Sequence, residues 1–140
     1  MKKVISILLL ATIFCCLLTS CGPSNAEKAS IRTKLTGTWY QESSSSTYYF
    51  HVFTPDNKYL KVEIYVNYKG DESIKKATRG TYDISAKYIK CKLEDGDNVE
   101  IIYDYNKNTS QLVSIGSGFE KTSSDYSWYS DYKTFKSMVN

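Results

Sequence analysis

The sequence is poor in the residues that carry most enzyme and metal chemistry. Its 140 residues include one histidine, His51, and two prolines. A lone histidine on a tyrosine-rich stretch, with no acidic or nucleophilic partner at a recognisable spacing, is typical of a packing or surface residue. The acidic pairs and triplets at 71–72 and 94–97 lack the spacing of a calcium loop, and one histidine does not make a zinc site. We therefore expect no cofactor, no metal and no enzymatic activity, with a carboxylate pair that meets only in space as the alternative left open.

Disulfide chemistry is also scarce, although four cysteines are present. Cys15 and Cys16 lie inside an apolar run of roughly 15 residues that follows Lys2 and Lys3. This is the length of the apolar region of a signal peptide and short of the ~20 residues of a spanning helix. We therefore assign residues 1–20 as a signal peptide. Cys91 alternates with apolar neighbours, which predicts a buried small side chain in a domain without a disulfide framework.

The end of that segment carries a motif. Leu18-Thr19-Ser20-Cys21 resembles the lipobox of bacterial lipoproteins, in which the cysteine becomes the first residue of the mature chain and receives the lipid. The resemblance implies that Cys21 is the lipid attachment site and that the membrane is a partner through this anchor. Gly22-Pro23-Ser24 lacks an Asp after the cysteine and an acidic cluster, so the resemblance implies the outer membrane, facing the periplasm. An ordinary secretory signal is the alternative.

The charge balance excludes one class of partner. Without Lys2 and Lys3 the 18 basic residues become 16 against 15 acidic ones, so the formal charge falls from +3 to +1. The basic residues are scattered among acidic ones rather than gathered on one segment. We therefore expect no nucleic-acid binding.

Most of the remaining chain alternates with period two, which is the pattern of half-buried strands. Strands are predicted at 46–53, 60–68, 80–84, 89–93 and 99–104, with turns of hairpin length between them. This spacing, without a long helix, predicts an all-β antiparallel meander that closes into a barrel or folds into a sandwich. Residues 21–34 are assigned as lipid anchor and tether, and Ile31 and Leu35 are spaced for a short helical turn before the first strand.

Two short motifs favour the barrel. Leu35-Thr36-Gly37-Thr38-Trp39 and Gly80-Thr81-Tyr82 resemble the Gly-x-Trp and Gly-x-Tyr strands of lipocalins and of the lipocalin-like domains in small Bacteroidetes lipoproteins. The resemblance implies a barrel of about eight strands over residues 35–122. It also implies that Trp39, after Gly37, closes one end of the barrel beneath the basic side chain of Lys121.

The C-terminal segment, residues 123–140, is aromatic. Trp128, Tyr132, Phe135 and Val139 are near helical spacing after Ser123-Ser124-Asp125, which predicts a capped helix that packs on the barrel. A strand that uses Tyr126 and Trp128 is the competing interpretation.

Tyrosine is abundant, with 13 residues against 5 Phe and 2 Trp. Many tyrosines simply cover a sheet, but tyrosine also combines apolar area with a hydroxyl and so suits a binding surface. An eight-stranded barrel is filled or holds one small ligand. We therefore predict a site for a small apolar or amphipathic ligand. The alternative is a filled barrel that acts as a non-enzymatic interaction module for an envelope protein or a glycan. The residues assigned to the ligand site are Tyr48, Phe50, Tyr82, Tyr103 and Tyr105.

The lipid assignment is testable through one atom. Replacing Cys21 with Ser removes the thiol that would be acylated, so the Cys21→Ser protein should stay an unprocessed precursor or move to the soluble fraction. Detergent phase partitioning and mass spectrometry of the mature chain measure both outcomes. A Cys21→Ser protein that matures and partitions like wild type contradicts the anchor.

Overall fold

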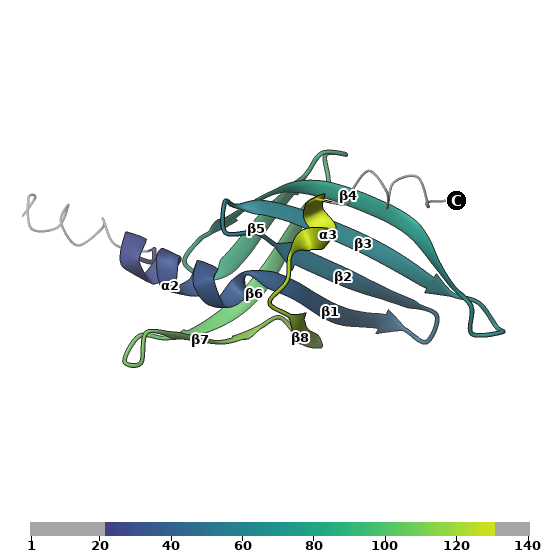
Figure 1. Cartoon of the computed structure of the whole chain (residues 1–140). Coiled ribbons are helices and arrows are strands. Elements are labelled where there is room, and N and C mark those ends of the chain that lie inside the picture. Colours follow the sequence, from purple (N-terminus) through teal and green to yellow (C-terminus); the bar gives the residue numbers. More distant parts are fainter. Residues whose placement is uncertain (1–21, 131–140) are drawn as a thin grey trace, which may run out of the picture.

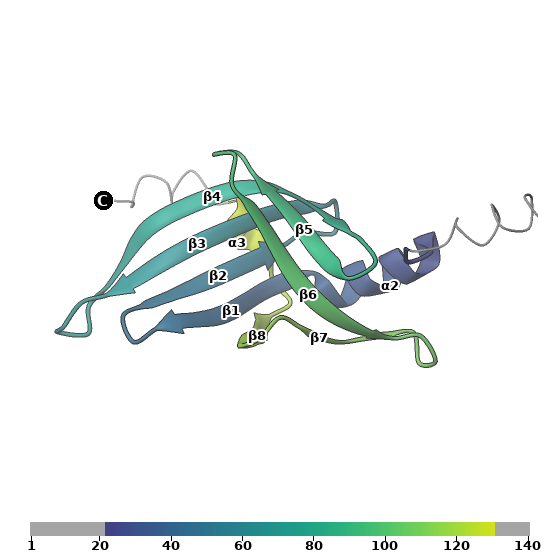
Figure 2. The same ribbon diagram turned by 180° about the vertical axis from the view of Figure 1, so that it is seen from behind.

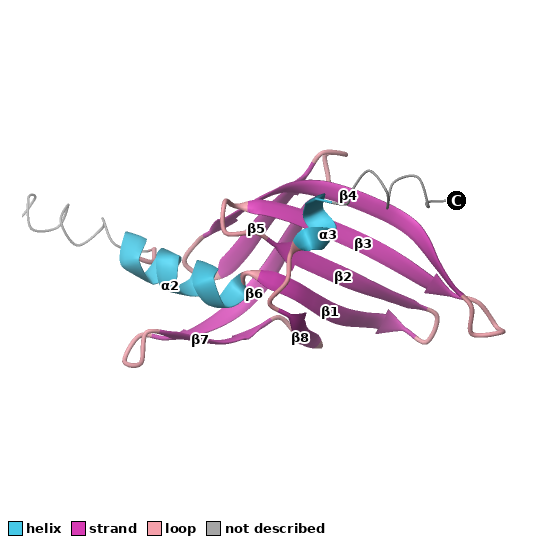
Figure 3. Ribbon diagram, in the orientation of Figure 1, coloured by secondary structure: helices cyan, strands magenta, loops and turns pink. Residues whose placement is uncertain are grey.

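The computed structural model describes residues 22–130 as an eight-stranded antiparallel barrel that is nearly closed, with a helix at one end (Figures 1 and 3). This confirms the predicted all-β barrel. No helix within this range is long and apolar enough to cross a membrane. The elements are α2 (Asn25–Leu35), β1 (Gly37–Ser44), β2 (Thr47–Phe53), β3 (Lys58–Val66), β4 (Glu72–Ile84), β5 (Tyr88–Leu93), β6 (Asn98–Asn106), β7 (Gln111–Ile115), β8 (Phe119–Ser123) and α3 (Ser127–Ser130).

The strands form a meander in the order β7-β6-β5-β4-β3-β2-β1-β8. Each of the strands β2 to β7 pairs antiparallel with the strand before it. The last strand, β8, pairs antiparallel with β1. The seam of the barrel therefore lies between β7 and β8, two strands of five residues each. Seen from behind, β5 and β6 curve across the barrel toward β7 (Figure 2).

Helix α2 begins with a capping box. The Ser24 hydroxyl accepts a hydrogen bond from the backbone N–H of Glu27, and the Glu27 carboxylate accepts one from the backbone N–H of Ser24. Ile31 and Leu35, one helical turn apart, are fully buried against the barrel. The predicted helical turn is therefore present, and the range assigned to anchor and tether includes a packed helix.

The inner core fills the half of the barrel next to α2. Ile31 and Leu35 pack there against side chains from strands β2 to β7. Since each methylene removed from water contributes about 0.8 kcal/mol, this cluster is the main source of stability in a domain without a disulfide. The buried strand residues of the inner core are Phe53, Tyr59, Tyr82, Ile84, Ile89, Cys91, Leu93, Ile101 and Ile115.

A second apolar cluster lies on the outer face of β2, β3 and β4. Leu60 and Val62 are fully buried in this cluster, whereas Lys61 between them shares the inner face with its cross-strand partner His51. The apolar side of β3 is thus outside the barrel. Helix α3 lies over this face, where the Trp128 ring is 4.8 Å from that of Phe50 in an edge-on contact (Figure 1).

The chain turns into α3 at Asp125. Its carboxylate accepts hydrogen bonds from the backbone N–H and the hydroxyl of Ser127, at 2.8 and 2.7 Å. Trp128 therefore belongs to a helical turn and not to a strand. The rest of the predicted C-terminal helix, 131–140, lies outside the residues that the structure describes.

Gly37 gives a test of the fold. Its φ is +129°, and a Cβ there would collide with the backbone oxygen of Ser123 and lie 2.9 Å from the Cα of Ser124. We expect Gly37→Ala to lower the free energy of unfolding by about 3 kcal/mol or more, since backbone strain and a clash with β8 add. Urea unfolding measures this loss.

Gly70 is the matched control. It also has a positive φ, +85°, but no atom lies within 4 Å of the position that a Cβ would take. Gly70→Ala should therefore cost only the backbone strain, about 1 kcal/mol. Equal losses in the two variants would show that the contact between β1 and β8 does not constrain Gly37.

Candidate ligand-binding site

Three polar side chains, Gln41, His51 and Tyr59, form a hydrogen-bonded network inside the barrel. The Nε2–H of His51 donates to Oε1 of Gln41 at 3.0 Å, and Nδ1 accepts from the hydroxyl of Tyr59 at 2.6 Å. This uses both ring nitrogens of a neutral imidazole. The Phe119 ring on β8 packs against this network, with its centroid 4.7 Å from that of the His51 ring.

Burial keeps the side chains of this network uncharged. Burial lowers the pKa of His51 to about 3, with the charge of Lys61 as a smaller cause. Burial also raises the pKa of Tyr59 well above its usual value. His51 is therefore a neutral, fully hydrogen-bonded packing residue, as the sequence indicated, and it offers no free nitrogen to a substrate.

The end of the barrel opposite α2, which we call the mouth, carries charged side chains. Lys61 lies over the Tyr49 ring, with Nζ 4.4 Å from the ring centroid. Across the mouth, the Lys76 ammonium contacts Asp95 at 2.6 Å and Asp97 at 3.6 Å. A cavity of about 140 Å³ lies between these groups, and it is small for most ligands. Its lining residues are Lys61, Glu63, Lys76, Thr78, Leu93 and Asp97.

A larger pocket opens through the side of the barrel. Strands β7 and β8 are short, so the barrel is open on the mouth side of the turn that joins them. A pocket of about 640 Å³ lies at this opening. Val99, Ile101 and Phe119 give it apolar walls, and Gln41 brings a polar group from the interior. Residues from both faces of β6 line it. The pocket therefore leads from solvent around the edge of β6 toward the lumen.

The backbone of β6 explains why this side is open. The carbonyl of Ile102 accepts a hydrogen bond from the N–H of Gly116 at 2.6 Å, so this edge of β6 faces β7. Peptide groups alternate sides along a strand, so those of Glu100 point the same way as those of Ile102. The pairing of β6 with β7 starts only at Tyr103, and no strand within residues 22–130 pairs with this edge at Glu100.

Three of the five tyrosine and phenylalanine residues predicted to bind ligand lie inside the barrel. The hydroxyl of Tyr82 donates to the carbonyl of Thr54 at 2.8 Å, and that of Tyr103 donates to the carbonyl of Ser85 at 2.6 Å. Tyr105 packs on the same inner core. The hydroxyls of Tyr82 and Tyr103 are therefore engaged within the fold, although Tyr103 also lines the lateral pocket.

The assignment of Tyr48 to the ligand site assumes that its side chain points into the barrel, and this orientation is wrong. Tyr48 and Phe50 belong to the outer cluster with Val52 and Trp128, and neither lines the lateral pocket. The error has a physical cause: β2 is apolar on both faces, so its alternation does not distinguish inside from outside. His51 and Phe53 occupy the inner face instead.

The contact implied for the barrel-closing residues is present. The Lys121 ammonium lies 5.7 Å from the centroid of the Trp39 ring and donates to the carbonyl of Lys34 at 2.7 Å. Trp39 Nε1 donates to the carbonyl of Leu35 at 2.8 Å. Gly37 lies against the end of β8, where a side chain has no room.

Of the two cysteines outside the assigned signal peptide, Cys91 is buried and Cys21 lies outside the described residues. Cys91 is 2% exposed, and burial raises the pKa of its thiol to about 12, so it is a packing residue. Cys21 lies just before the first residue that the structure describes. Between Gly22 and Ser130 no group of three or more His, Cys, Asp or Glu side chains converges as a metal site would.

The sequence analysis missed the residues that line the lateral pocket. Gln41 lies two residues after Trp39 on the same strand face, so its inward orientation follows from that of Trp39. Val99 and Ile101 were predicted strand residues without an assigned role. The position of the opening had no sequence signal, because it depends on where β7 and β8 end.

Comparisons of this chain with protein-family models, with curated proteins and with solved structures found no match.

The buried histidine predicts a pH dependence of stability. In the unfolded chain His51 has a pKa near 6.5, and in the folded state about 3, so the unfolded state binds more protons between these values. The stability contributed by neutral His51 is complete above about pH 6.5 and decreases as the pH falls. Between pH 7 and pH 5 we expect a loss of about 2 kcal/mol from this group, measured by urea unfolding at each pH.

His51→Gln supplies the control, because a Gln side chain stays neutral and keeps polar atoms beside Tyr59 and Gln41. The variant is expected to be less stable at pH 7 but to lose about 2 kcal/mol less than wild type on acidification to pH 5. The same pH slope in both proteins would show that His51 does not titrate on unfolding.

Proposed function

We propose that this protein is a lipid-anchored, lipocalin-like binding protein of the cell envelope that takes a small amphipathic molecule through the side of its barrel. The lateral pocket of about 640 Å³ is the observation that carries the proposal. Its volume is within the range of roughly 300–1,000 Å³ in which proteins hold small ligands.

The lining supports an amphipathic ligand. Val99, Ile101 and Phe119 offer an apolar wall, and burying an apolar group there contributes about 25 cal/mol per Å² of surface removed from water. The amide of Gln41 stands at the inner end, while Glu100 and Asp104 line the outer rim. A molecule with an apolar body and a polar end therefore fits better than a wholly apolar one, which would displace water from these polar groups without bonding to them.

A second function, a non-enzymatic interaction module for an envelope protein or a glycan, has one observation in its favour. The half of the barrel next to α2 is filled, and the hydroxyls of Tyr82 and Tyr103 bond to backbone carbonyls there. That half has no need of a ligand. The polar mouth is outside that half, and the lateral pocket opens at its border, where Ile101 and Tyr103 line it. For this reason we favour small-molecule binding.

The proposal includes the anchor. Residues 18–21 support attachment of a lipid to Cys21, and the flanking residues support the outer membrane on its periplasmic side. No nucleic acid or metal is needed for this function. The anchor and the ligand site are separate statements, and different experiments test them.

Filling the lateral pocket tests ligand binding. Val99 is half-buried, lies on the inner face of β6 and lines the pocket, so a Val99→Trp side chain would occupy the space of the ligand. We expect saturable binding of the amphipathic probe 1-anilinonaphthalene-8-sulfonate to wild type. Val99→Trp should weaken it at least about tenfold, which is 1.4 kcal/mol. Fluorescence titration measures both dissociation constants.

The control is Val113→Trp on β7, where the native side chain is 61% exposed and outside the pocket lining. It should change binding less than about twofold. Near-ultraviolet circular dichroism of each variant checks that the fold is kept, because partly unfolded proteins also bind this probe. Absence of saturable binding by folded wild type, or equal losses in the two variants, would refute the site.

A further inference from the structure

The connection between Cys21 and the folded domain is short. Helix α2 begins at Asn25, and Ser24 is its N-cap. Only Gly22, Pro23 and Ser24 separate the helix from Cys21. Three fully extended residues span at most about 11 Å.

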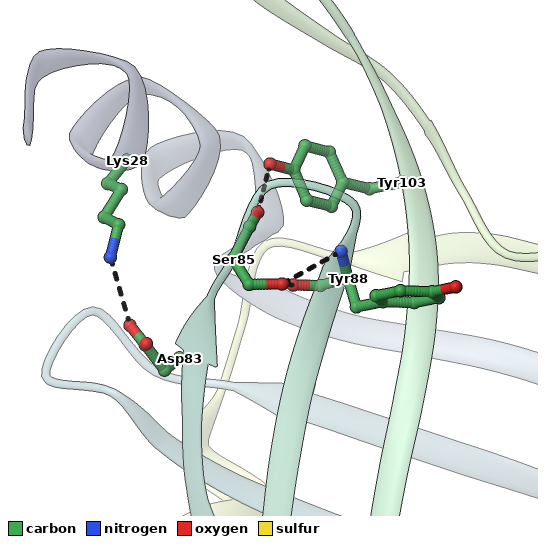
Figure 4. Close-up of polar contacts among 5 residues, drawn as sticks. All are labelled: Lys28, Asp83, Ser85, Tyr88 and Tyr103. Atoms are coloured by element: carbon green, nitrogen blue, oxygen red, sulfur yellow. Dashed lines mark hydrogen bonds and ion pairs between the residues drawn. The ribbon is translucent and has the colours of Figure 1, made fainter. Parts of the chain in front are cut away.

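Helix α2 does not lengthen this connection, because it is fixed to the barrel. Besides the burial of Ile31 and Leu35, the Ser30 hydroxyl donates to the carbonyl of Ser110 at 2.7 Å. Lys28 reaches from the helix to Asp83 at the end of β4, with Nζ 3.6 Å from the carboxylate oxygen (Figure 4). Helix and barrel therefore move as one body.

The start of the described chain also lies at a defined place on the barrel. Gly22 and Pro23 line two surface pockets together with Ala86 from the β4–β5 turn and Lys107 from the β6–β7 turn. Both turns are at the end of the barrel that carries α2. We call this surface, made of residues 22–24 with the turns 85–87 and 107–110, the helix end.

We propose that the helix end is a membrane-contact surface, which holds the barrel upright on the bilayer with its mouth pointing away. This rests on the lipid anchor of the proposed function. An acyl chain on Cys21 has only three residues of slack, so the helix end stays within about 11 Å of the headgroups. The mouth, with the β3–β4 turn at 67–71, is separated from it by the nine residues of β3, about 30 Å.

The chemistry of the helix end fits a phospholipid headgroup surface. Its exposed residues are small or polar, and the charges on it and around it are mixed. Lys107 shares a surface pocket with Glu27 and Asp104 at its border, and the neighbouring Lys28 is paired with Asp83. No exposed apolar wedge is present on the residues described there, and no single sign of charge prevails. The tether, and not attraction to anionic lipid, therefore sets the orientation, and it should be insensitive to salt.

Site-specific quenching measures the orientation. Lipidated full-length protein is placed in phosphatidylcholine vesicles that contain a lipid with a nitroxide on its headgroup. A fluorophore is attached through Ala86→Cys at the helix end or through Tyr68→Cys at the tip of the β3–β4 turn, where Tyr68 is 91% exposed. Cys91 is buried and does not react in the folded protein. We expect strong quenching at position 86 and little at position 68, in low and in high salt.

A variant with a longer tether is the matched control. A flexible Gly/Ser insert of about 20 residues between Gly22 and Pro23 adds a mean reach of about 25 Å, so the two labels should then be quenched to similar degrees. Equal quenching at positions 86 and 68 in the protein without the insert overturns the proposed orientation and leaves the anchor intact. If wild type and Cys21→Ser both fail to bind vesicles, the anchor falls, and the membrane-contact surface falls with it.

Discussion

The structure depends on how the C-terminal end of α2 is satisfied where it meets the barrel. The last carbonyls of a helix have no partner inside the helix, and burying them unpaired would cost on the order of 1–3 kcal/mol each. Here Trp39 and Lys121 supply the donors, from β1 and from β8. The same two side chains form a cation–aromatic contact that ties β8 to its paired neighbour β1. One small cluster thus holds the C-terminal end of α2 against β1 and β8 at one end of the barrel.

The sequence predicted the strands well and the faces of the strands less well. Alternation of apolar and polar residues located β2, β3, β5 and β6 to within about two residues of their ends, because a strand has a period of two whichever way it faces. It found only the last part of β4, 80–84, although that strand begins at Glu72. It did not tell inside from outside. On β3 the polar Lys61 and Glu63 line the mouth, and the apolar Leu60 and Val62 face outward under Trp128. Only the position of α3, which is a long-range contact, decides between these arrangements.

The sequence led us to expect a pocket lined by aromatic residues, but it did not indicate where the structure has one. A tyrosine hydroxyl inside a barrel needs a hydrogen-bond partner, and Tyr82 and Tyr103 find theirs in the carbonyls of nearby turns rather than in a ligand. The lateral pocket lies elsewhere, because β7 and β8 end early. They leave one edge of β6 without a paired strand around Glu100, while its other edge pairs with β5. Strand length is set by cooperative pairing across the sheet, and a residue-by-residue pattern contains little information about it.

The free edge of β6 also bears on self-association. Unpaired strand edges invite other chains to extend the sheet, and folded proteins protect such edges with charge. Glu100 is at the centre of this edge, with its carboxylate 3.8 Å from the ammonium of Lys90 on β5. A second copy that docked antiparallel about this residue would place two Glu100 carboxylates opposite each other, and like charges in that position repel. The edge that borders the lateral pocket therefore discourages growth of a shared sheet between molecules.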